Sequence, residues 1–441
     1  SSLAYCYLEH VLSLLGLEGQ VPILKYGVTY PLDREVLRAF ADQVEELIVV
    51  EEKRPFLEEQ ITSALQEMYQ AGEIGPYRVW GKRFSRDREG LPSDRGLNPS
   101  ILLQRLAPLF LEGDDPEVDI DRELISNEVA LIERTDRYDV RAAVRTPSFC
   151  PGCPHRDSAS VLNRVVDDFM DETYMQREHG SHPVDLVFHG DIGCYTLLKY
   201  EPFDRLIHNL SGMGLGGGTG AGIDPFITNK QLVFMGDSTF FHSGMAAISD
   251  SIKNGQDITY VILDNKTTAM TGHQPTPGVD TDIMGQPTFA QDIEQVVRGM
   301  VRSKGPRSTV VVRMNPADRK TYRRRVEETL LKDGVKIIIA DKECGITYHR
   351  RARAEEAGIV KEKGYLPKEV RINVTPDVCE YCLECTRATG CSGLTVEQTL
   401  RGPKIITDYS LCVSDGACTK VTVADGDKTC PSFEEITIRR R

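Results

Sequence analysis

Two short polar motifs follow apolar runs of the kind that form neighbouring strands in an α/β sheet. Gly236-Asp237-Ser238 is the first and Asp264-Asn265 the second, and Asn265 lies 28 residues after Asp237. This offset accommodates one helix and one strand, which predicts both side chains at adjacent strand ends, where open α/β sheets bind ligands. The Asp237 carboxylate, the Asn265 amide and the Thr267 main-chain carbonyl are the oxygen ligands that hard divalent cations such as Mg²⁺ prefer.

A diphosphate is a suitable ligand for a cation held in this way, because it is a polyanion. Helices that begin after these turns would also offer free N–H groups to phosphate. The alternative is that both motifs are ordinary turn residues. Residues 212–222 contain seven glycines, and this run either lets backbone approach a cofactor or forms a flexible surface loop.

Cysteines are the second chemical signal. Cys150 and Cys153 form a clip with two intervening residues, a spacing that suits zinc and iron–sulfur clusters equally. Cys194 and Cys344 are candidates to complete a four-cysteine cluster site, although a buried free thiol is the alternative for Cys344. The chain has twelve cysteines in 441 residues. Their spaced groups favour metal or cluster ligation in a reducing cytoplasm over a disulfide framework.

Most of the remaining cysteines lie in about the last 70 residues. Their spacing resembles that of a bacterial two-cluster ferredoxin, in which the fourth cysteine of each run binds the other cluster. By this resemblance one [4Fe–4S] cluster is held by Cys379, Cys382, Cys385 and Cys430. The second cluster would have three cysteine ligands, Cys391, Cys412 and Cys418. It is therefore a three-iron cluster, uses a non-cysteine ligand such as Asp415, or is absent. Zinc binding is the alternative for the whole tail.

Bulk composition narrows the function classes. The formal net charge of −13 argues against nucleic acid as the main partner. No apolar run reaches the roughly 18 to 20 residues that span a bilayer, and we find no signal peptide. We therefore expect a cytoplasmic protein with no membrane partner. The chain begins with serine and reads from its start like the middle of a domain, which suggests a fragment or a processed product.

Strand and helix patterns alternate along most of the chain, which predicts an α/β fold. In residues 1–110 we expect a strand at 21–26, a helix from Pro31, a buried parallel strand at 47–50 and a helix at 56–69. Residues 111–145 are expected to be a linker carrying a helix at about 121–132. Residues 146–345 should form a second α/β domain, with strands at 184–188, 231–235, 259–263, 310–313 and 335–340. A linker at 346–369 would then lead to a ferredoxin-like α+β domain at 370–441.

Four motifs in the second domain resemble the large subunit of indolepyruvate:ferredoxin oxidoreductases, within the 2-oxoacid:ferredoxin oxidoreductase superfamily. They are residues 150–155 (CPGCPH), 190–194 (GDIGC), 236–240 (GDSTF) and 264–275 (DNKTTAMTGHQP). The resemblance implies a thiamine-diphosphate-binding fold, preceded by a transketolase C-terminal-like domain. It also implies a [4Fe–4S] cluster on Cys150, Cys153, Cys194 and Cys344. The residues matched to cofactor contacts are Ile192, Gly193, Cys194, Tyr195, Gly236, Asp237, Ser238, Thr239, Asn265, Thr267, Ala269 and Met270.

The function implied by this resemblance is thiamine-dependent oxidative decarboxylation of a 2-oxo acid, aryl-substituted like indolepyruvate, to an acyl-CoA. The implied cofactors are thiamine diphosphate, Mg²⁺ and at least two [4Fe–4S] clusters, with electrons leaving to ferredoxin or a similar acceptor. A smaller subunit is implied as a partner. The pyrimidine-binding domain and its catalytic glutamate are not found in this chain, and Glu51 and Glu52 fit strand-end surface acids better. His155 and His273 lie in the cofactor loops, but no catalytic residue is assigned.

Two other functions remain open at this stage. One is a non-catalytic electron-transfer subunit with a vestigial thiamine site. The other is a non-oxidative thiamine decarboxylase or carboligase, which the seven tail cysteines disfavour because such enzymes need no clusters.

Overall fold

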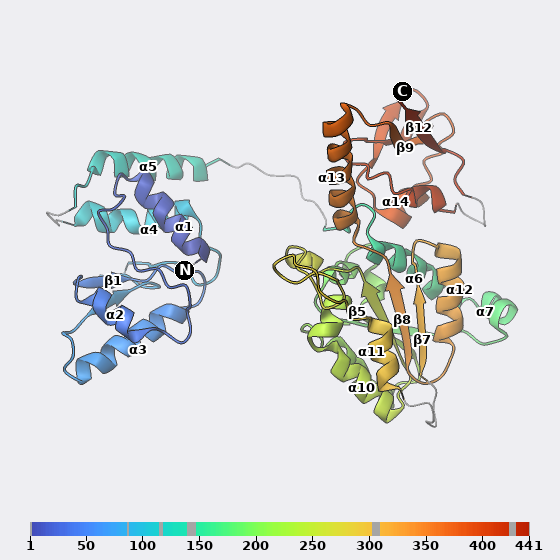
Figure 1. Cartoon of the computed structure of the whole chain (residues 1–441), viewed down its shortest axis with the longest axis horizontal. Coiled ribbons are helices and arrows are strands. Elements are labelled where there is room, and N and C mark those ends of the chain that lie inside the picture. The colour runs from blue at the N-terminus through green and yellow to red at the C-terminus, as the bar shows by residue number, and fades with distance from the viewer. Residues whose placement is uncertain are drawn as a thin grey trace. The chain divides into compact units, whose positions relative to one another are not determined.

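The computed structural model describes residues 2–85, 88–113, 118–138, 147–301, 309–422 and 429–440. The chain divides into two compact units, residues 1–144 and 145–441 (Figure 1). The boundary expected at 145/146 lies outside the described residues. No helix in the described ranges combines the length and apolar character needed to cross a membrane.

The first unit surrounds a small parallel sheet with helices. Its elements are α1 (Ser2–Leu14), α2 (Arg34–Ala41), β1 (Glu46–Ile48), α3 (Phe56–Gln70), β2 (Arg78–Trp80), α4 (Pro99–Glu112) and α5 (Arg122–Asp136). β1 and β2 pair in parallel. Val11 of α1, Leu102 of α4 and Ile125 of α5 share one buried core. The helix expected within the 111–145 linker, α5, therefore packs into this unit.

Three expectations for the first unit need correction. The strand expected at 21–26 is wrong, since this segment is extended but joins no strand ladder among the described residues. Pro22 cannot donate a ladder hydrogen bond, which disfavours pairing there. The helix expected from Pro31 begins only at Arg34, because the Asp33 side chain caps it by accepting the Val36 N–H at 3.1 Å. Strand β1 is buried on one face only.

A six-stranded parallel sheet in the order β4-β3-β5-β6-β8-β7 organises the second unit. The strands are β3 (Leu186–Gly190), β4 (Asn209–Leu210), β5 (Lys230–Gly236), β6 (Ile258–Asp264), β7 (Val310–Met314) and β8 (Lys336–Asp341). All seven residues of β6 are buried, as expected for a central strand covered on both faces. The five strands expected in this domain are confirmed to within two residues at each end.

Helices cover both faces of this sheet (Figure 1). They are α6 (Pro154–Met170), α7 (Glu172–His179), α8 (Gly216–Ile223), α10 (Met245–Asn254), α11 (Ile293–Met300) and α12 (Arg319–Leu330). The glycine run forms α8 and its N-terminal turn, so it is not a flexible loop. A Cβ on Gly220 would lie 2.8 Å from Ile258 Cδ1, which shows how closely α8 packs on the sheet.

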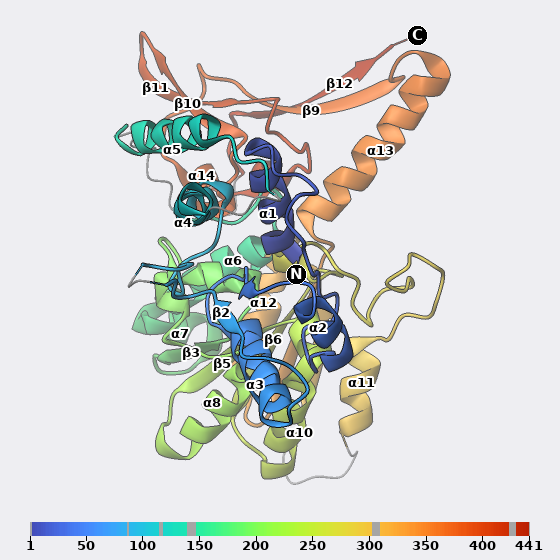
Figure 2. The same cartoon turned by 90° about the vertical axis from the view of Figure 1, so that its left-hand side faces the viewer.

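The segment expected as the second linker forms helix α13 (Gly345–Lys363), which leads into the tail (Figure 2). The tail contains β9 (Lys368–Val374), α14 (Glu384–Thr389), β10 (Leu394–Thr399), β11 (Gly402–Thr407) and β12 (Phe433–Arg439). β9 pairs antiparallel with β12, and β10 with β11.

The tail docks on α6. Arg156 donates to the carbonyl oxygens of Thr386 at 3.2 Å and Arg387 at 3.0 Å. Gly390 has a φ of +52°, and a Cβ there would lie 1.9 Å from Arg156 Cζ. Only glycine therefore leaves room for this arginine.

Candidate functional site

Strand register brings the two polar motifs to one edge of the sheet. Gly236 at the end of β5 is level with Leu263 of β6, and Asp264 is level with Asp341 of β8. Asp237 begins the short helix α9 (Asp237–Thr239), directly after β5. The predicted proximity of Asp237 to the start of the 264–275 motif thus follows from parallel pairing.

Asp237 is buried, and one of its two carboxylate oxygens accepts no hydrogen bond from the described residues. Its side chain is 2% exposed, and Oδ2 has no hydrogen-bond partner among the described residues. Main-chain N–H groups of Ser238 and Thr267 face the carboxylate. Burial, with a smaller contribution from Asp264, raises the pKa of Asp237 to about 7. An unpartnered buried carboxylate is costly unless it is neutralised or binds a cation.

Asn265 is oriented by its neighbours. Its Nδ2 lies 3.2 Å from His155 Nε2, and its Oδ1 accepts the Thr267 N–H at 3.3 Å. Burial lowers the pKa of His155 to about 4, so this imidazole is neutral near pH 7 and Nε2 can accept the amide proton. Lys266 lies in the sequence between the candidate ligands Asn265 and Thr267. Its φ of +64° is a strained conformation of a kind that clusters at functional sites. The Asp237 and Asn265 oxygens fit a hard divalent cation.

Tyr195 links the loops around this edge. Its hydroxyl donates to Asp191 Oδ1 and lies 3.1 Å from Thr239 Oγ1. Asp191 Oδ2 accepts the Gly214 N–H at 3.1 Å. Burial raises the pKa of Asp191 to about 6. The loop after β3, helix α9 and the glycine-rich turn before α8 are therefore held together by one hydrogen-bonded group.

The other expected cofactor contacts lie in the same loops. Position 193 has no room for a side chain, because a Cβ on Gly193 would lie 2.3 Å from Tyr195 Cε1. Ile192 and Met270 are 43% and 49% exposed. Ser238 and Ala269 are half-buried. The carbonyl of Thr267, expected as a cation ligand, accepts the Ala269 N–H at 2.9 Å.

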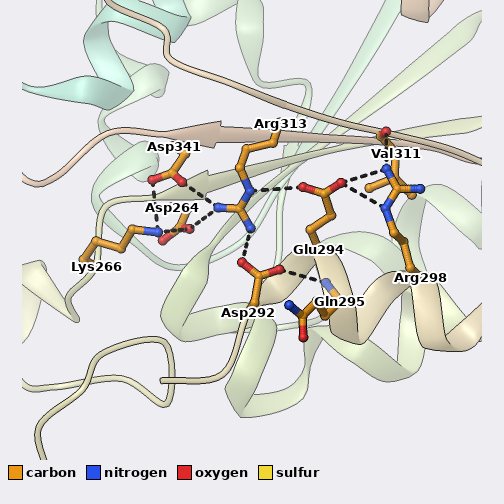
Figure 3. A network of polar contacts seen from close by, with 9 residues as sticks. All are labelled: Asp264, Lys266, Asp292, Glu294, Gln295, Arg298, Val311, Arg313 and Asp341. Atoms are coloured by element: carbon orange, nitrogen blue, oxygen red, sulfur yellow. Dashed lines mark hydrogen bonds and ion pairs between the residues drawn. The ribbon is translucent and has the colours of Figure 1, made fainter. Parts of the chain in front are cut away.

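Arg313 at the end of β7 is a site residue that sequence reasoning missed (Figure 3). It ion-pairs with four carboxylates, which belong to Asp264, Asp341, Asp292 and Glu294. Lys266 pairs with the first two of these. Asp264 precedes the 265–292 loop, while Asp292 and Glu294 end it and begin α11. One guanidinium therefore fixes both ends of the loop that carries Asn265. The sequence does show acidic residues at the ends of these strands and at the start of α11. It does not show that all four share Arg313 as their partner.

The four cysteines expected beside the cofactor gather near Asp237. Burial, with smaller contributions from the nearby thiols of Cys344 and Cys150 and from the Asp237 carboxyl, raises the pKa of the Cys194 thiol to about 11. Burial likewise raises the pKa of Cys153, with Cys194 and Cys150 as neighbours. The Cys344 N–H donates to the Asn265 carbonyl at 3.0 Å.

Gly345 accounts for the approach of Cys344 to the distant clip. A Cβ on Gly345 would lie 2.7 Å from the Pro151 carbonyl oxygen and 2.8 Å from that of Gly152. The first turn of α13 thus packs directly on the clip backbone.

The tail cysteines separate into two groups. Burial raises the pKa of Cys385 to about 12, and its thiol neighbours are Cys430, Cys382 and Cys379. The N–H groups of Tyr381 and Ile405 each lie 3.4 Å from Cys379 Sγ, and such hydrogen bonds tune cluster ligands. The second group contains Cys391, Cys412 and Cys418, which line one cavity.

These thiols do not form a single-ion site. Within the described ranges, no three His, Cys, Asp or Glu side chains converge closely enough to hold one metal ion. An iron–sulfur cluster keeps its thiolates farther apart than one ion does, so the grouping is compatible with clusters. The cluster assignments stay predictions.

Comparisons with known proteins agree with this geometry. Residues 191–339 match the family described as "Thiamine pyrophosphate enzyme, C-terminal TPP binding domain", and residues 3–136 match the "Indolepyruvate oxidoreductase domain". The chain is related to the indolepyruvate oxidoreductases. This confirms the resemblance and the thiamine-diphosphate-binding α/β fold expected from the sequence.

The relatives cover almost all of this chain. "Indolepyruvate oxidoreductase subunit IorA" of Archaeoglobus fulgidus is 31% identical over 95% of this chain and 57% of its own length. The protein of the same name from Methanothermobacter thermautotrophicus is 29% identical over 96% and 58%. The chain therefore spans less than three-fifths of the length of these relatives. A solved structure of a 2-oxoglutarate:ferredoxin oxidoreductase from Magnetococcus marinus aligns with a TM-score of 0.36 and 17% sequence identity. The alignment covers 48% of this chain and 72% of the other.

The two acids of the first unit have structural partners. Glu51 is buried rather than a surface acid, and it accepts the Leu57 N–H at 2.8 Å and the Glu58 N–H at 3.0 Å, which caps the start of α3. Glu52 accepts the Leu97 N–H at 3.2 Å. His273 Nδ1 lies 3.3 Å from Thr347 Oγ1 at the start of α13.

Proposed function

We propose that this chain is the thiamine-diphosphate-binding part of a 2-oxoacid:ferredoxin oxidoreductase. The observation that carries the proposal is the Asp237 carboxylate, which is buried and has an oxygen without a hydrogen-bond partner among the described residues. It lies near Cys194 and faces the Thr267 N–H, which also donates to Asn265 Oδ1. A cation-binding edge and a group of redox-capable thiols therefore meet at one place. The two family matches support the same conclusion.

In this proposal Asp237 and Asn265 hold Mg²⁺, which grips the diphosphate. Thiamine diphosphate, when bound, supplies the carbanion chemistry of decarboxylation. The chain's own residues position it: His155 orients the Asn265 amide, and Tyr195 ties together the loops beneath it. Cys150, Cys153, Cys194 and Cys344 would hold a [4Fe–4S] cluster, which would supply one-electron redox chemistry beside the cofactor site, and the tail cysteines would hold the clusters that pass electrons onward.

The substrate class follows from the relatives' names. We propose an aryl-substituted 2-oxo acid such as indolepyruvate, with coenzyme A as acyl acceptor and ferredoxin or a similar protein as electron acceptor. The catalytic glutamate and its pyrimidine-binding domain would come from outside the sequence described, and a smaller subunit would complete the enzyme. We propose the cytoplasm as its compartment.

Cofactor binding tests this proposal. Isothermal titration of the anaerobically prepared chain with Mg²⁺ and thiamine diphosphate should show saturable binding that Asp237→Ala abolishes. Asp250→Ala, on the exposed side of α10, is the matched control and should bind like the wild type. Iron and acid-labile sulfide measured on the same samples should indicate at least two clusters. Clusters without thiamine diphosphate binding would instead support a non-catalytic electron-transfer subunit.

A further inference from the structure

A cavity in the second unit is walled by three cysteines and one aspartate. Cys391, Cys412 and Cys418 line it together with Asp415. The opposite wall includes Gly152 and Cys153 of the clip beside the candidate cofactor site. The cavity therefore lies between the tail and the thiols that neighbour Asp237.

The sequence places Asp415 in a cysteine's position. The first tail run has the spacing Cys379-x2-Cys382-x2-Cys385. Exactly 33 residues later, the same spacing recurs as Cys412-x2-Asp415-x2-Cys418. Asp415 thus stands where the first run has its middle cysteine, and Cys391 and Cys430 are the single cysteines outside the two runs.

Backbone contacts hold this loop in place at the cavity. Asp415 Oδ1 accepts the Ala417 N–H at 3.1 Å. The Ser414 N–H lies 3.4 Å from Cys412 Sγ. A Cβ on Gly393 would lie 3.0 Å from Cys412 Cα, which brings the Cys391 segment against the second run.

The clip makes room for the carboxylate. Gly152 has a φ of +69°, and a Cβ there would lie 2.9 Å from Asp415 Oδ2. The Asp415 carboxylate therefore lies against the backbone of the clip at Gly152, where a side chain would crowd Oδ2. The oxygen not engaged by Ala417 is the one on this side.

We propose that Asp415 is the fourth ligand of an iron–sulfur cluster held by Cys391, Cys412 and Cys418. The inference rests on the proposed electron-transfer function and assigns its second tail cluster a mixed ligand set. A carboxylate is a harder ligand than a thiolate and suits a soft iron–sulfur site less well. The iron bound by Asp415 should consequently be the exchangeable one. Loss of this Fe²⁺ from a [4Fe–4S]²⁺ cluster leaves [3Fe–4S]⁰, which ferricyanide oxidises by one electron to [3Fe–4S]⁺.

The position of the cavity gives the cluster a role. Gly152 and Cys153 of the clip and Ile372 of β9 line the same cavity, so a cluster held there would lie between the cofactor-proximal thiols and the tail sheet. A cluster in this position would be placed to pass electrons between the proximal thiols and the tail.

EPR spectroscopy and iron analysis of the full chain, reconstituted anaerobically with iron and sulfide, test the proposal. Wild type should develop the oxidised three-iron EPR signal on brief ferricyanide treatment, and added Fe²⁺ with dithionite should reverse it. Asp415→Cys should retain all its iron and give no such signal. Asp415→Ala should contain one iron fewer per chain before any treatment, and ferricyanide should then oxidise its [3Fe–4S]⁰ cluster to the EPR-active form with no further loss of iron. Asp377→Ala, an exposed aspartate of the tail, is the control and should match the wild type.

Other outcomes overturn the assignment. If Asp415→Ala and Asp415→Cys both behave like the wild type, Asp415 is no ligand. If Ser414→Ala causes the iron loss instead, the neighbouring hydroxyl fills the position. The Cys379–Cys430 cluster serves as an internal standard for folding in every variant. Thiamine diphosphate binding, measured on the same samples, reports separately on the proposed function and does not depend on Asp415.

Discussion

Replacing Asp237 with asparagine should stabilise the cofactor-free protein while destroying its cation site. The ordinary pKa of an aspartate is 3.8, whereas burial raises that of Asp237 to about 7. At 1.36 kcal/mol per pKa unit, keeping this carboxylate ionised in the folded chain costs about 4 kcal/mol. Because the folded-state pKa is the higher one, stability is greatest below about pH 4 and is lost as the pH rises through about 7. Asp237→Asn removes this loss.

The expected result is a pH-dependent difference between two cofactor-free proteins. At pH 4 wild type and Asp237→Asn should unfold at the same urea concentration, since Asp237 is then neutral. At pH 8 the variant should be more stable by up to about 4 kcal/mol. Far-UV circular dichroism follows the whole chain. The single tryptophan, Trp80, lies in the first unit, so its fluorescence is an internal control that should not respond.

Adding the ligands should reverse the order of stability. Mg²⁺ with thiamine diphosphate should stabilise the wild type at pH 8, because ligands that bind only the folded state raise its stability, and should leave Asp237→Asn unchanged. Equal stability of the two cofactor-free proteins at pH 8 would refute the argument from burial. Retention of magnesium and thiamine diphosphate by the variant would refute the assignment of the cation site. Asp250→Asn is the matched control.

Three further substitutions test the surrounding elements. Cys344→Ser should change iron content and the reduced-state EPR signal together while thiamine diphosphate still binds, because its N–H bond to Asn265 is main-chain; unchanged iron would make Cys344 a core thiol. Cys430→Ser should remove one cluster, not two, and slow transfer to an external acceptor while substrate-driven reduction of the proximal cluster persists; full turnover would show that electrons leave by another route. Arg313→Met should lower the free energy of unfolding by about 3 kcal/mol, as expected for a broken, largely buried ion pair, and speed proteolysis between residues 266 and 292; unaltered proteolysis would show that Arg313 does not hold this loop.

Sequence patterns predicted the central sheet well because burial on both faces leaves a visible signature. The β6 segment contains the apolar run 260–263, and the structure buries the whole strand. Helix α13 left no such signature. Only Gly345 among its residues is buried, so its surface shows no apolar stripe and the segment resembles a charged linker.

Long-range partners set the limit of prediction at the site. The adjacency of the strand ends before Asp237 and Asn265 could be anticipated, since the two residues are one helix and one strand apart. The role of Arg313 could not, because its carboxylate partners come from Asp264, Asp292, Glu294 and Asp341 and meet only in the folded sheet. The grouping of Cys430 with the first tail run was expected only from the ferredoxin resemblance, because the local sequence does not specify that β12 pairs with β9.

The contact between α6 and the tail has a kinetic consequence. A freely diffusing electron carrier reaches its donor at a rate that falls with dilution. Here Arg156 and Gly390 fix the tail against the helix that begins at the Cys150–Cys153 clip, so the tail is present at a constant effective concentration. The rate of any electron transfer between the tail cysteines and the clip cysteines should therefore be independent of protein concentration. Natural variation at Arg156 or Gly390 could then change its rate without altering a single ligand.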